Sequence, residues 1–269
     1  MTKLISIKSL LLLCCLFGAS QASAFSRTGH QQVCQAAYQL LSDDTQQQVD
    51  ALLALKPGQS FADGCVWPDE ARGEAAYRYT APHHFINVAR KAREVKARDC
   101  ATVGCLLSAI QHHGNLLKKL PLNEPKRQSL LFFSHFIADL HQPLHVSYAA
   151  DQGGNKTAVY FLKQPSNLHG VWDRALLTEL GYEQNENLLT EKLAKVSAKE
   201  QQLWRQGNAL SWANESLAQT INIYQHYRPG MLLDESAVKR DGPIAERRLQ
   251  QAAVRLAALL EQQLKTNAR

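Results

Sequence analysis

The sequence predicts a mainly α-helical protein, a single-domain helical bundle with a short β-hairpin or loop insertion. Apolar residues recur at three- and four-residue intervals along most of the chain, while strand-like alternation is short and rare. No internal repeat, low-complexity stretch or linker divides the sequence. The 269 residues, 45% hydrophobic and 20% charged, can bury a sizeable core and lack the composition of a disordered, collagen-like or multi-span membrane protein.

The first 24 residues are typical of a secretory signal peptide. Lys3 and Lys8 precede an apolar run over residues 10–17, which is too short to span a bilayer, and Ala22-Ser23-Ala24 is a small-x-small cleavage site. Cleavage would leave residues 25–269 as one domain that begins at Phe25. We therefore expect an exported, periplasmic or secreted protein; the alternative is an uncleaved N-terminal anchor.

Four of the six cysteines lie after the predicted cleavage site: Cys34, Cys65, Cys100 and Cys105. An even number in an oxidising compartment favours two disulfides. Cys100 and Cys105 enclose four residues and form the natural local pair, which leaves Cys34 with Cys65. A zinc site built from these thiols is the alternative, although no C-x-x-C spacing supports it.

The periodicity places the elements in order along the chain. We expect helices over residues 29–55, 102–119, 125–142, 170–181, 188–194, 198–227 and 242–265. Gly58 and Pro68 indicate a loop over 56–68, and Pro143 ends the third helix. A glycine-containing loop over 148–156 leads to a short alternating run, 157–162, which predicts a small strand or hairpin arm.

Histidine and aspartate recur at a spacing that suits a metal ion. His135 and Asp139 are four residues apart and share one face of a predicted helix, and His169 and Asp173 repeat this spacing. Pro143 ends this helix, so His145 should point in a different direction from His135 and Asp139. One such pair is usually a surface hydrogen bond, but five histidines and three aspartates in four segments indicate a metal centre. Imidazole and carboxylate ligands suit Zn²⁺.

The same residues lie in longer motifs that resemble the zinc-dependent S1/P1 nucleases, within the wider phospholipase C/P1 nuclease group. The resemblance covers nearly all of residues 25–269. It rests on Gly29-His30, Trp67-x-Asp69, His84-Phe85-Ile86-Asn87, the run HFIADLHQPLH at 135–145, Gly153-Gly154-Asn155, Asn167-Leu168-His169 with Trp172-Asp173, Trp212-Ala213-Asn214-Glu215-Ser216, and the closing helix around Arg248-Leu249 and Arg255-Leu256-Ala257.

The resemblance implies three zinc ions per chain. The first would be bound by Asp69, His84, His135 and Asp139; the second by Asp139, His30 and the α-amine and carbonyl of Phe25; and the third by His145, His169 and Asp173. Only cleavage before Phe25 creates that amine. The family usually begins with Trp, whereas this sequence has Phe25 at that position. Chelation by the backbone amine and carbonyl does not need the indole ring. The family's ligand directly precedes an aromatic residue, which selects His84 over His83, and His141 is not a ligand in that pattern.

The resemblance also implies an activity: a single-strand-preferring endonuclease on DNA and RNA, with 3′-nucleotidase activity and 5′-phosphorylated products. Asp69 would orient the nucleophile and Arg72 would neutralise charge on phosphate, unless Arg72 forms a surface salt bridge with Glu70 or another neighbour. Phe85 and Asn155 would hold a base, unless Phe85 is a core residue. Asn87 stands where some members carry Asp for base recognition.

Two other functions remain open: a zinc-dependent phospholipase C and a non-enzymatic zinc-binding exported protein. The net charge is +6, and losing Lys3 and Lys8 would leave 28 basic against 24 acidic residues, an excess compatible with a polyanionic partner. We expect single-stranded DNA, RNA and nucleotides as substrates, a monomer, and no stable membrane association.

Overall fold

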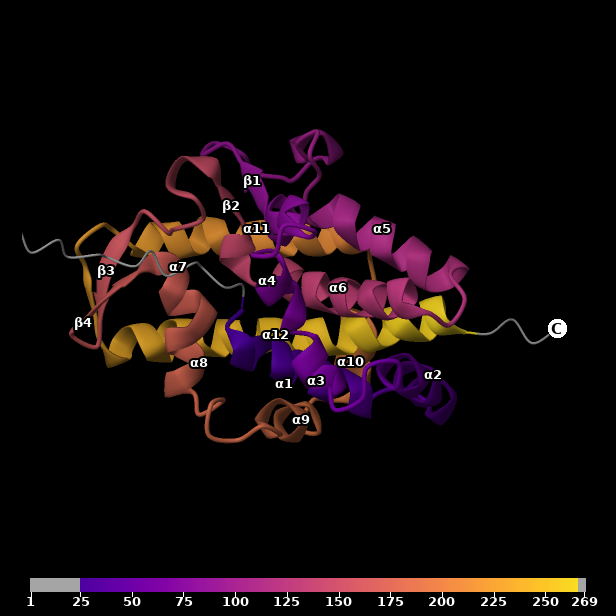
Figure 1. Ribbon diagram of the computed structural model, residues 1–269. Helices are drawn as coiled ribbons and strands as arrows, with labels where there is room; N and C mark the ends of the chain where they lie inside the picture. Colours follow the sequence, from indigo (N-terminus) through magenta and orange to yellow (C-terminus); the bar gives the residue numbers. More distant parts are fainter. Residues whose placement is uncertain (1–24, 266–269) are drawn as a thin grey trace, which may run out of the picture.

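Three long helices run side by side through the middle of the molecule: α6 (Glu124–His141), α11 (Ala209–His226) and α12 (Glu235–Leu264) (Figure 1). This computed structural model describes residues 25–265, so the predicted signal peptide, residues 1–24, lies outside the described residues. The mainly α-helical class is confirmed. Among the described residues, no helix is both long and apolar enough to cross a bilayer.

Shorter helices pack around these three. The N-terminal part contains α1 (Arg27–Gln39), α2 (Asp43–Leu53), α3 (Phe61–Gly64), α4 (Trp67–Ala71), the 3₁₀ helices η1 (Arg78–His84) and η2 (Ala97–Asp99), and α5 (Leu106–Lys119). The later part contains the 3₁₀ helices η3 (Pro143–His145) and η4 (Ala149–Asp151), then α7 (Leu168–Gly170), the π-helical turn η5 (Val171–Ala175), α8 (Leu176–Glu179), α9 (Leu188–Leu193) and α10 (Ala198–Trp204).

Two helices expected to be continuous are each divided. The helical pattern over 29–55 is broken after Gln39, and a second helix begins at Asp43, with acidic residues in its first turn. The pattern over 198–227 is broken at Gly207, whose φ of +94° is incompatible with a right-handed helix. The Asn208 side chain then accepts a hydrogen bond from the amide of Ser211 and starts α11.

The last helix is longer than expected. It begins at Glu235 rather than near residue 242, because Asp234 caps it by accepting a hydrogen bond from the amide of Ser236. It continues through Pro243 without ending. The proline therefore does not mark the boundary that its chemistry usually predicts.

The strands form two small sheets. β3 (Ala158–Phe161) and β4 (Gln164–Asn167) make the expected hairpin, with β5 (Leu232–Leu233) added parallel to β3. β1 (Ile86–Val88) pairs in parallel with β2 (Val146–Tyr148), opposing Asn87 with Ser147. This second sheet was not predicted from the sequence, and it brings the segment after His84 beside the segment after His145.

Both expected cysteine pairs are present as disulfides, Cys34–Cys65 and Cys100–Cys105. The first joins α1 to the end of α3 next to the large apolar core. The core includes one face of the last helix, with Leu249, Leu256 and Leu260 fully buried. These helices form the support on which the polar residues described next are arranged.

Candidate metal centre

Eight buried histidine and aspartate side chains from different elements meet at one end of α6. Together they form three groups whose ligand atoms lie within 4.8 Å of one another: His30, His135 and Asp139; Asp69, His84 and His135; and His145, His169 and Asp173. The structure thus brings together every His and Asp side chain that the resemblance implied as a zinc ligand. Only the division of the first two groups differs: His135 belongs to both, whereas Asp139, which was expected in both, is grouped with His30 and His135.

Asp139 lies at the centre of the first two groups. Its Oδ2 is 3.0 Å from Nδ1 of His84 and 3.2 Å from Nε2 of His135, and its Oδ1 is 3.3 Å from Nε2 of His30. The imidazoles of His30 and His135 stack with ring centroids 3.8 Å apart. Asp69 completes the second group, with Oδ1 3.6 Å from Nδ1 of His84. A carboxylate with both oxygens facing imidazoles can bridge two ions.

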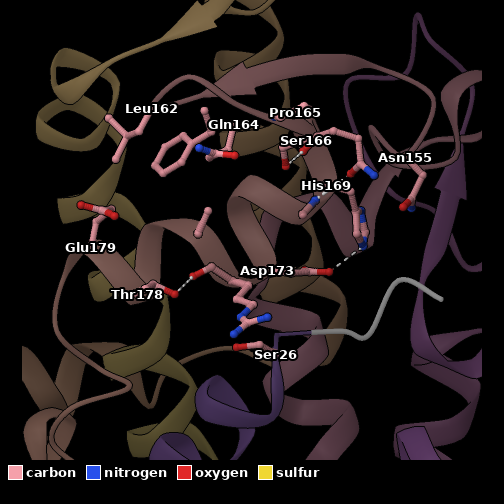
Figure 2. Close-up of a pocket in the computed structure, with 15 residues that line it drawn as sticks. Ser26, Asn155, Leu162, Gln164, Pro165, Ser166, His169, Asp173, Thr178 and Glu179 are labelled. Carbon is pink, nitrogen blue, oxygen red and sulfur yellow. Dashed lines mark hydrogen bonds and ion pairs between the residues drawn. The ribbon is translucent and has the colours of Figure 1, made fainter. Parts of the chain in front are cut away.

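The third group stands beside the others. Nε2 of His169 is 3.1 Å from Oδ2 of Asp173, and Nε2 of His145 is 3.6 Å from Oδ1 of the same carboxylate. His145 also links the groups, because its Nδ1 lies 3.7 Å from Oδ1 of Asp139. The four-residue spacing of His169 and Asp173 falls across α7 and the π-helical turn η5, which directs both side chains to one place (Figure 2).

Backbone carbonyls orient three of the imidazoles. Nδ1 of His135 lies 2.7 Å from the carbonyl oxygen of Cys65, and Nδ1 of His169 lies 2.7 Å from that of Gly153. Nδ1 of His145 lies 2.6 Å from the carbonyl oxygen of His84. When Nδ1–H donates to a carbonyl, Nε2 is left as a lone-pair donor, as metal-bound histidine requires.

The chemistry of the donors fits metal ions. Nε2 of His84, Nε2 of His145, Oδ1 of Asp139 and both ring nitrogens of His30 are buried without a hydrogen-bond partner among the described residues. Buried polar atoms of this kind are costly unless something else satisfies them. Burial lowers the pKa of His84 to about 4, so this ring is a neutral ligand. Burial alone would raise the pKa of Asp139, but His135 and His145 hold it well below its ordinary value.

Phe25 is fully buried at the edge of this centre. The amide of the next residue, Ser26, donates to the carbonyl oxygen of Asp173 at 2.9 Å. The carbonyl of Ser26 in turn accepts from the amide of His30 at 3.2 Å, at the start of α1. The start of the predicted mature chain is therefore held between a residue of the third group and one of the first.

A cleft of about 300 Å³ opens onto the ligands. It is lined by Arg72, His84, Phe85, Asn87, Leu144, His145, Gln152, Gly153, Asn155 and His169. Phe85 is 38% exposed there, so the interpretation of its ring as a core residue is wrong. Gly153 has a φ of +64°, and a Cβ on it would lie 2.5 Å from the carbonyl oxygen of Leu144, so glycine is needed where this loop passes the cleft.

Arg72 faces the cleft rather than pairing with Glu70. Its Nη2 is 3.4 Å from Oδ1 of Asp69, and Glu70 pairs instead with Arg27. A larger cavity of about 680 Å³ lies beside the third group and shares Asn155, His169 and Asp173 with the site (Figure 2). The amide of Asn155 donates to the carbonyl of Gln152, which fixes the loop between the two openings.

The other histidines of the motifs have different surroundings. His83 lies with Nε2 3.2 Å from the carbonyl of Val103, and none of the three groups contains it. Nε2 of His141 accepts a hydrogen bond from Arg255 at 2.9 Å. His113, which lies outside the motifs, stacks on Phe132 where α5 packs on α6.

Sequence reasoning missed one residue in direct contact with the ligands. Gln142 is fully buried, and its Nε2 donates to Oδ1 of Asp173 at 2.5 Å while its Oε1 accepts from the amide of Leu144. Its position between the predicted ligands Asp139 and His145 is the sequence feature that could have indicated this role.

The end of α6 is held by residues from α11 and α12. Ser216 donates to the carbonyl of Leu140 at 2.5 Å, and Arg248 donates to the carbonyl of His141 at 3.1 Å. Glu215 accepts hydrogen bonds from both Arg248 and Arg255. These contacts satisfy the last carbonyls of α6 and fix the turn between Asp139 and His145.

Comparisons with known proteins agree with this geometry. The family model described as S1/P1 Nuclease matches residues 25–265. Endonuclease 1 of Arabidopsis thaliana is 32% identical over 96% of this chain and 92% of its own length. Nuclease S1 of Aspergillus oryzae is 31% identical over 54% of this chain and 52% of its own, and nuclease P1 of Penicillium citrinum is 33% identical over 54% and 55%. The chain belongs to the S1/P1 nuclease family.

Proposed function

We propose that this protein is an exported, zinc-dependent phosphodiesterase that cuts single-stranded DNA and RNA. It would leave 5′-phosphorylated ends and remove phosphate from 3′-nucleotides. The observation that carries the proposal is the position of three metal-capable groups along a cleft that also presents an exposed aromatic ring. The relatives named as nucleases and endonucleases support the same reaction class.

The residues that would hold three zinc ions are His30, Asp69, His84, His135, Asp139, His145, His169, Asp173 and the backbone of Phe25. Such ions would supply Lewis acidity toward phosphate and would lower the pKa of water. Asp139 would bridge two of them. Phe25 would contribute its α-amine and carbonyl only after cleavage behind Ala24, so export and metal binding would be linked.

Two side chains beside the ligands would act on the substrate. Asp69 would orient the attacking nucleophile. The guanidinium of Arg72, held 3.4 Å from the Asp69 carboxylate, would donate hydrogen bonds to phosphate oxygens as charge develops there. Since Arg72 is largely buried in the cleft wall, its charge acts with less solvent screening than a surface arginine.

Residues at the rim of the cleft would bind a base of the substrate. Phe85 directly follows the ligand His84, and a base stacked on its ring would gain roughly 1–3 kcal/mol whatever its identity. Asn87 and Asn155 line the same cleft and offer amide donors and acceptors to the base edge. Stacking of this kind requires an unpaired base, which would favour single strands.

The test is a comparison of three substrates: single-stranded DNA, lecithin and a small chromogenic phosphodiester. We expect hydrolysis of the DNA and of the chromogenic ester, and none of lecithin. Hydrolysis of lecithin without DNA would instead establish a phospholipase C, and no hydrolysis at all would establish a non-enzymatic zinc-binding protein.

Asp69→Asn and Glu70→Gln provide matched variants within one turn of α4. The first should lower the rate of DNA hydrolysis by about a hundredfold or more, and the second, at a surface ion pair with Arg27, should leave it unchanged. Full activity of Asp69→Asn would remove the role proposed for that carboxylate.

A further inference from the structure

A basic segment extends directly from the cleft. Residues 89–99, here called the basic loop, connect β1 to Cys100. The loop has five basic residues against two acidic ones, Glu94 and Asp99, and all five basic side chains are exposed: Arg90, Lys91, Arg93, Lys96 and Arg98. Among the described residues, Lys91, Arg93 and Arg98 form no ion pair, whereas Lys96 pairs with Glu94.

This loop accounts for the positive charge of the described protein. Of the 30 Lys and Arg, Lys3, Lys8 and Arg269 lie outside residues 25–265, which leaves 27 against 24 Asp and Glu. The excess of three equals the excess within the basic loop, so the remainder of the described chain is neutral overall. A concentration of charge in one segment, rather than over the surface, favours a local polyanionic ligand.

The backbone of the basic loop is fixed at several points. The guanidinium of Arg90 lies 4.4 Å from the ring centre of Tyr148 and 4.3 Å from that of Tyr224. Val95 is buried, and its amide donates to Oδ1 of Asn214 at 2.7 Å. The Cys100–Cys105 disulfide follows at the end. The charges are therefore presented from an ordered loop, which lowers the entropy cost of binding.

The loop continues the path of the cleft. Phe85 and Asn87 line the cleft, and β1 leads from them to the loop at the edge of the molecule in Figure 1. Arg90 lies three positions after Asn87, a span of at most about 11 Å, which is close to the Debye length of about 10 Å at 0.1 M salt. The field of the loop therefore reaches the rim where a base would stack.

We propose that the basic loop binds the phosphates of a single-stranded polynucleotide beyond the nucleotides held in the cleft. This inference rests on the proposed function and adds a preference for long strands over small phosphodiesters. A membrane surface is a poorer partner, because within residues 89–99 no large apolar side chain is exposed to insert among lipids.

The test compares the triple variant Lys91→Gln, Arg93→Gln, Arg98→Gln with a control, Lys118→Gln, Lys119→Gln, Lys195→Gln. The control removes the same charge from exposed lysines at the end of α5 and after α9. Arg90 and Lys96 are retained because they make the contacts described above. The substrates are a single-stranded oligonucleotide of about 20 residues and a small chromogenic phosphodiester, each measured over a range of salt concentrations.

For the oligonucleotide, we expect kcat/KM of the loop variant to fall roughly tenfold at low salt, mainly through KM. The slope of log kcat/KM against log salt should become shallower by up to about 2. Each basic side chain that contacts a phosphate of a single strand releases counterions and contributes about 0.7 to this slope, and the variant lacks three such side chains. The chromogenic substrate should be hydrolysed as by wild type, and the control variant should match wild type on both.

Three results would overturn the inference: an unchanged KM and salt slope on the oligonucleotide, an equal fall in the control variant, or an equal fall on the chromogenic ester. Loss of sedimentation with phosphatidylserine–phosphatidylcholine vesicles, without a change on the oligonucleotide, would assign the loop to membranes instead. Failure of the wild-type protein to cleave the oligonucleotide would be a failure of the proposed function, so the two failures are distinguishable.

Discussion

At the scale of single residues, the candidate centre depends on side chains that orient the ligands as well as on the ligands. Gln142 shows this most directly. It joins Asp173 of the third group to the turn that carries His145, through one hydrogen bond from each end of its amide. Neighbours that orient metal ligands contribute substantially to affinity, although they never touch the ion.

Replacement of Gln142 by Leu should weaken zinc binding at the third group by about 10- to 100-fold, because Asp173 loses the donor that fixes it. Zinc retained after dialysis against a chelator of known affinity measures this directly. Gln128→Leu, at a partly buried position on α6 where the side chain donates to Glu124 rather than to a ligand, is the control and should retain its zinc. Equal zinc retention by the two variants would show that Gln142 does not position a ligand.

The ligand types could be predicted from the sequence, and their orientation could not. Spacing of four residues put His135 with Asp139 and His169 with Asp173, and the structure has both pairs in contact. The carbonyls that orient the rings belong to Cys65, His84 and Gly153. Every residue has a backbone carbonyl, so the residue type does not show which ones accept from a histidine. The choice of His84 over His83 came from the family pattern, because residue type and spacing fit both.

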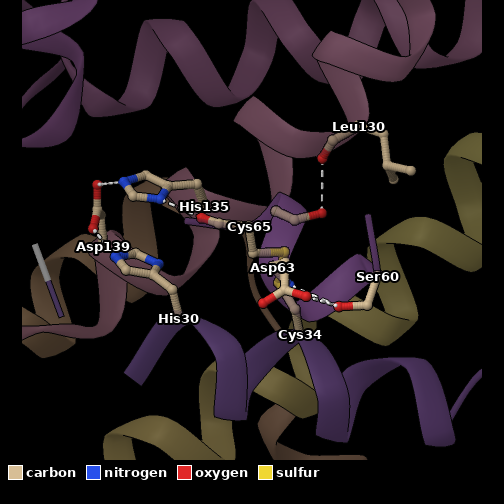
Figure 3. The surroundings of a disulfide bond; sticks show 9 residues. His30, Cys34, Ser60, Asp63, Cys65, Leu130, His135 and Asp139 are labelled. Atoms are coloured by element: carbon tan, nitrogen blue, oxygen red, sulfur yellow. Dashed lines mark hydrogen bonds and ion pairs between the residues drawn. A yellow bond between two sulfur atoms is a disulfide. The ribbon is translucent and has the colours of Figure 1, made fainter. Parts of the chain in front are cut away.

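At the scale of elements, the Cys34–Cys65 disulfide joins α1 to the segment before α4, and Cys65 also contacts His135 on α6 (Figure 3). Cys34 lies one turn after His30 on α1, and Cys65 lies four residues before Asp69. The carbonyl of Cys65 also orients His135 on α6. The second disulfide, Cys100–Cys105, closes a short loop that contains none of the candidate ligands and provides a natural comparison.

Removal of the first disulfide by Cys34→Ala with Cys65→Ala should accelerate zinc loss to a chelator, whereas Cys100→Ala with Cys105→Ala should not. The first change should also lower the free energy of unfolding by about 2–4 kcal/mol, so zinc loss must be measured where circular dichroism shows the variant to be folded. Equal rates of zinc loss from the two folded variants would mean that the disulfide stabilises the fold without bracing the centre.

The packing of α5 on α6 has a pH dependence of its own. His113 is buried and stacks on Phe132 with ring centroids 4.8 Å apart. Burial, with the charges of His112 and His83, lowers the pKa of His113 to about 3. The unfolded chain therefore protonates this histidine near pH 6.5, whereas the folded chain does so only near pH 3. The free energy of unfolding consequently falls as the pH decreases from 6.5 toward 3.

Between pH 6.5 and pH 5, this histidine should reduce the free energy of unfolding by up to about 2 kcal/mol, at about 1.4 kcal/mol per pH unit. His113→Gln should remove that part of the pH dependence, and His112→Gln, at an exposed neighbour, should keep it. Urea unfolding at several pH values measures the difference. Parallel curves for wild type and His113→Gln would contradict the assignment.

Prediction of the elements succeeded where a pattern was local. The apolar periodicity and Pro143 predicted α6, and the alternating run at 157–162 became one arm of the β3–β4 hairpin. It failed where tertiary contacts decide. The β1–β2 pair joins three-residue segments about 60 residues apart, too short for any pattern, and α12 continues through Pro243 within the packed bundle.

At the scale of the whole molecule, the bundle gathers ligands that are distant in the chain. They extend from His30 on α1 to Asp173 in η5, and α6 supplies two of them from the middle of the core. Polar contacts from α11 and α12 then fix the end of α6. The family resemblance divides these ligands into three sets at the level of sequence, and the fold adds their geometry, in which His135 is shared by two groups.

The most direct measurement of the central claim is the zinc content of the exported protein, determined by elemental analysis alongside its N-terminal residue. We expect about three zinc ions per chain in protein that begins at Phe25, because each of the three groups then has its full set of ligands. A ratio of one or none in such protein would contradict a three-ion centre that includes the Phe25 amine, and so would three ions in protein that retains residues before Phe25.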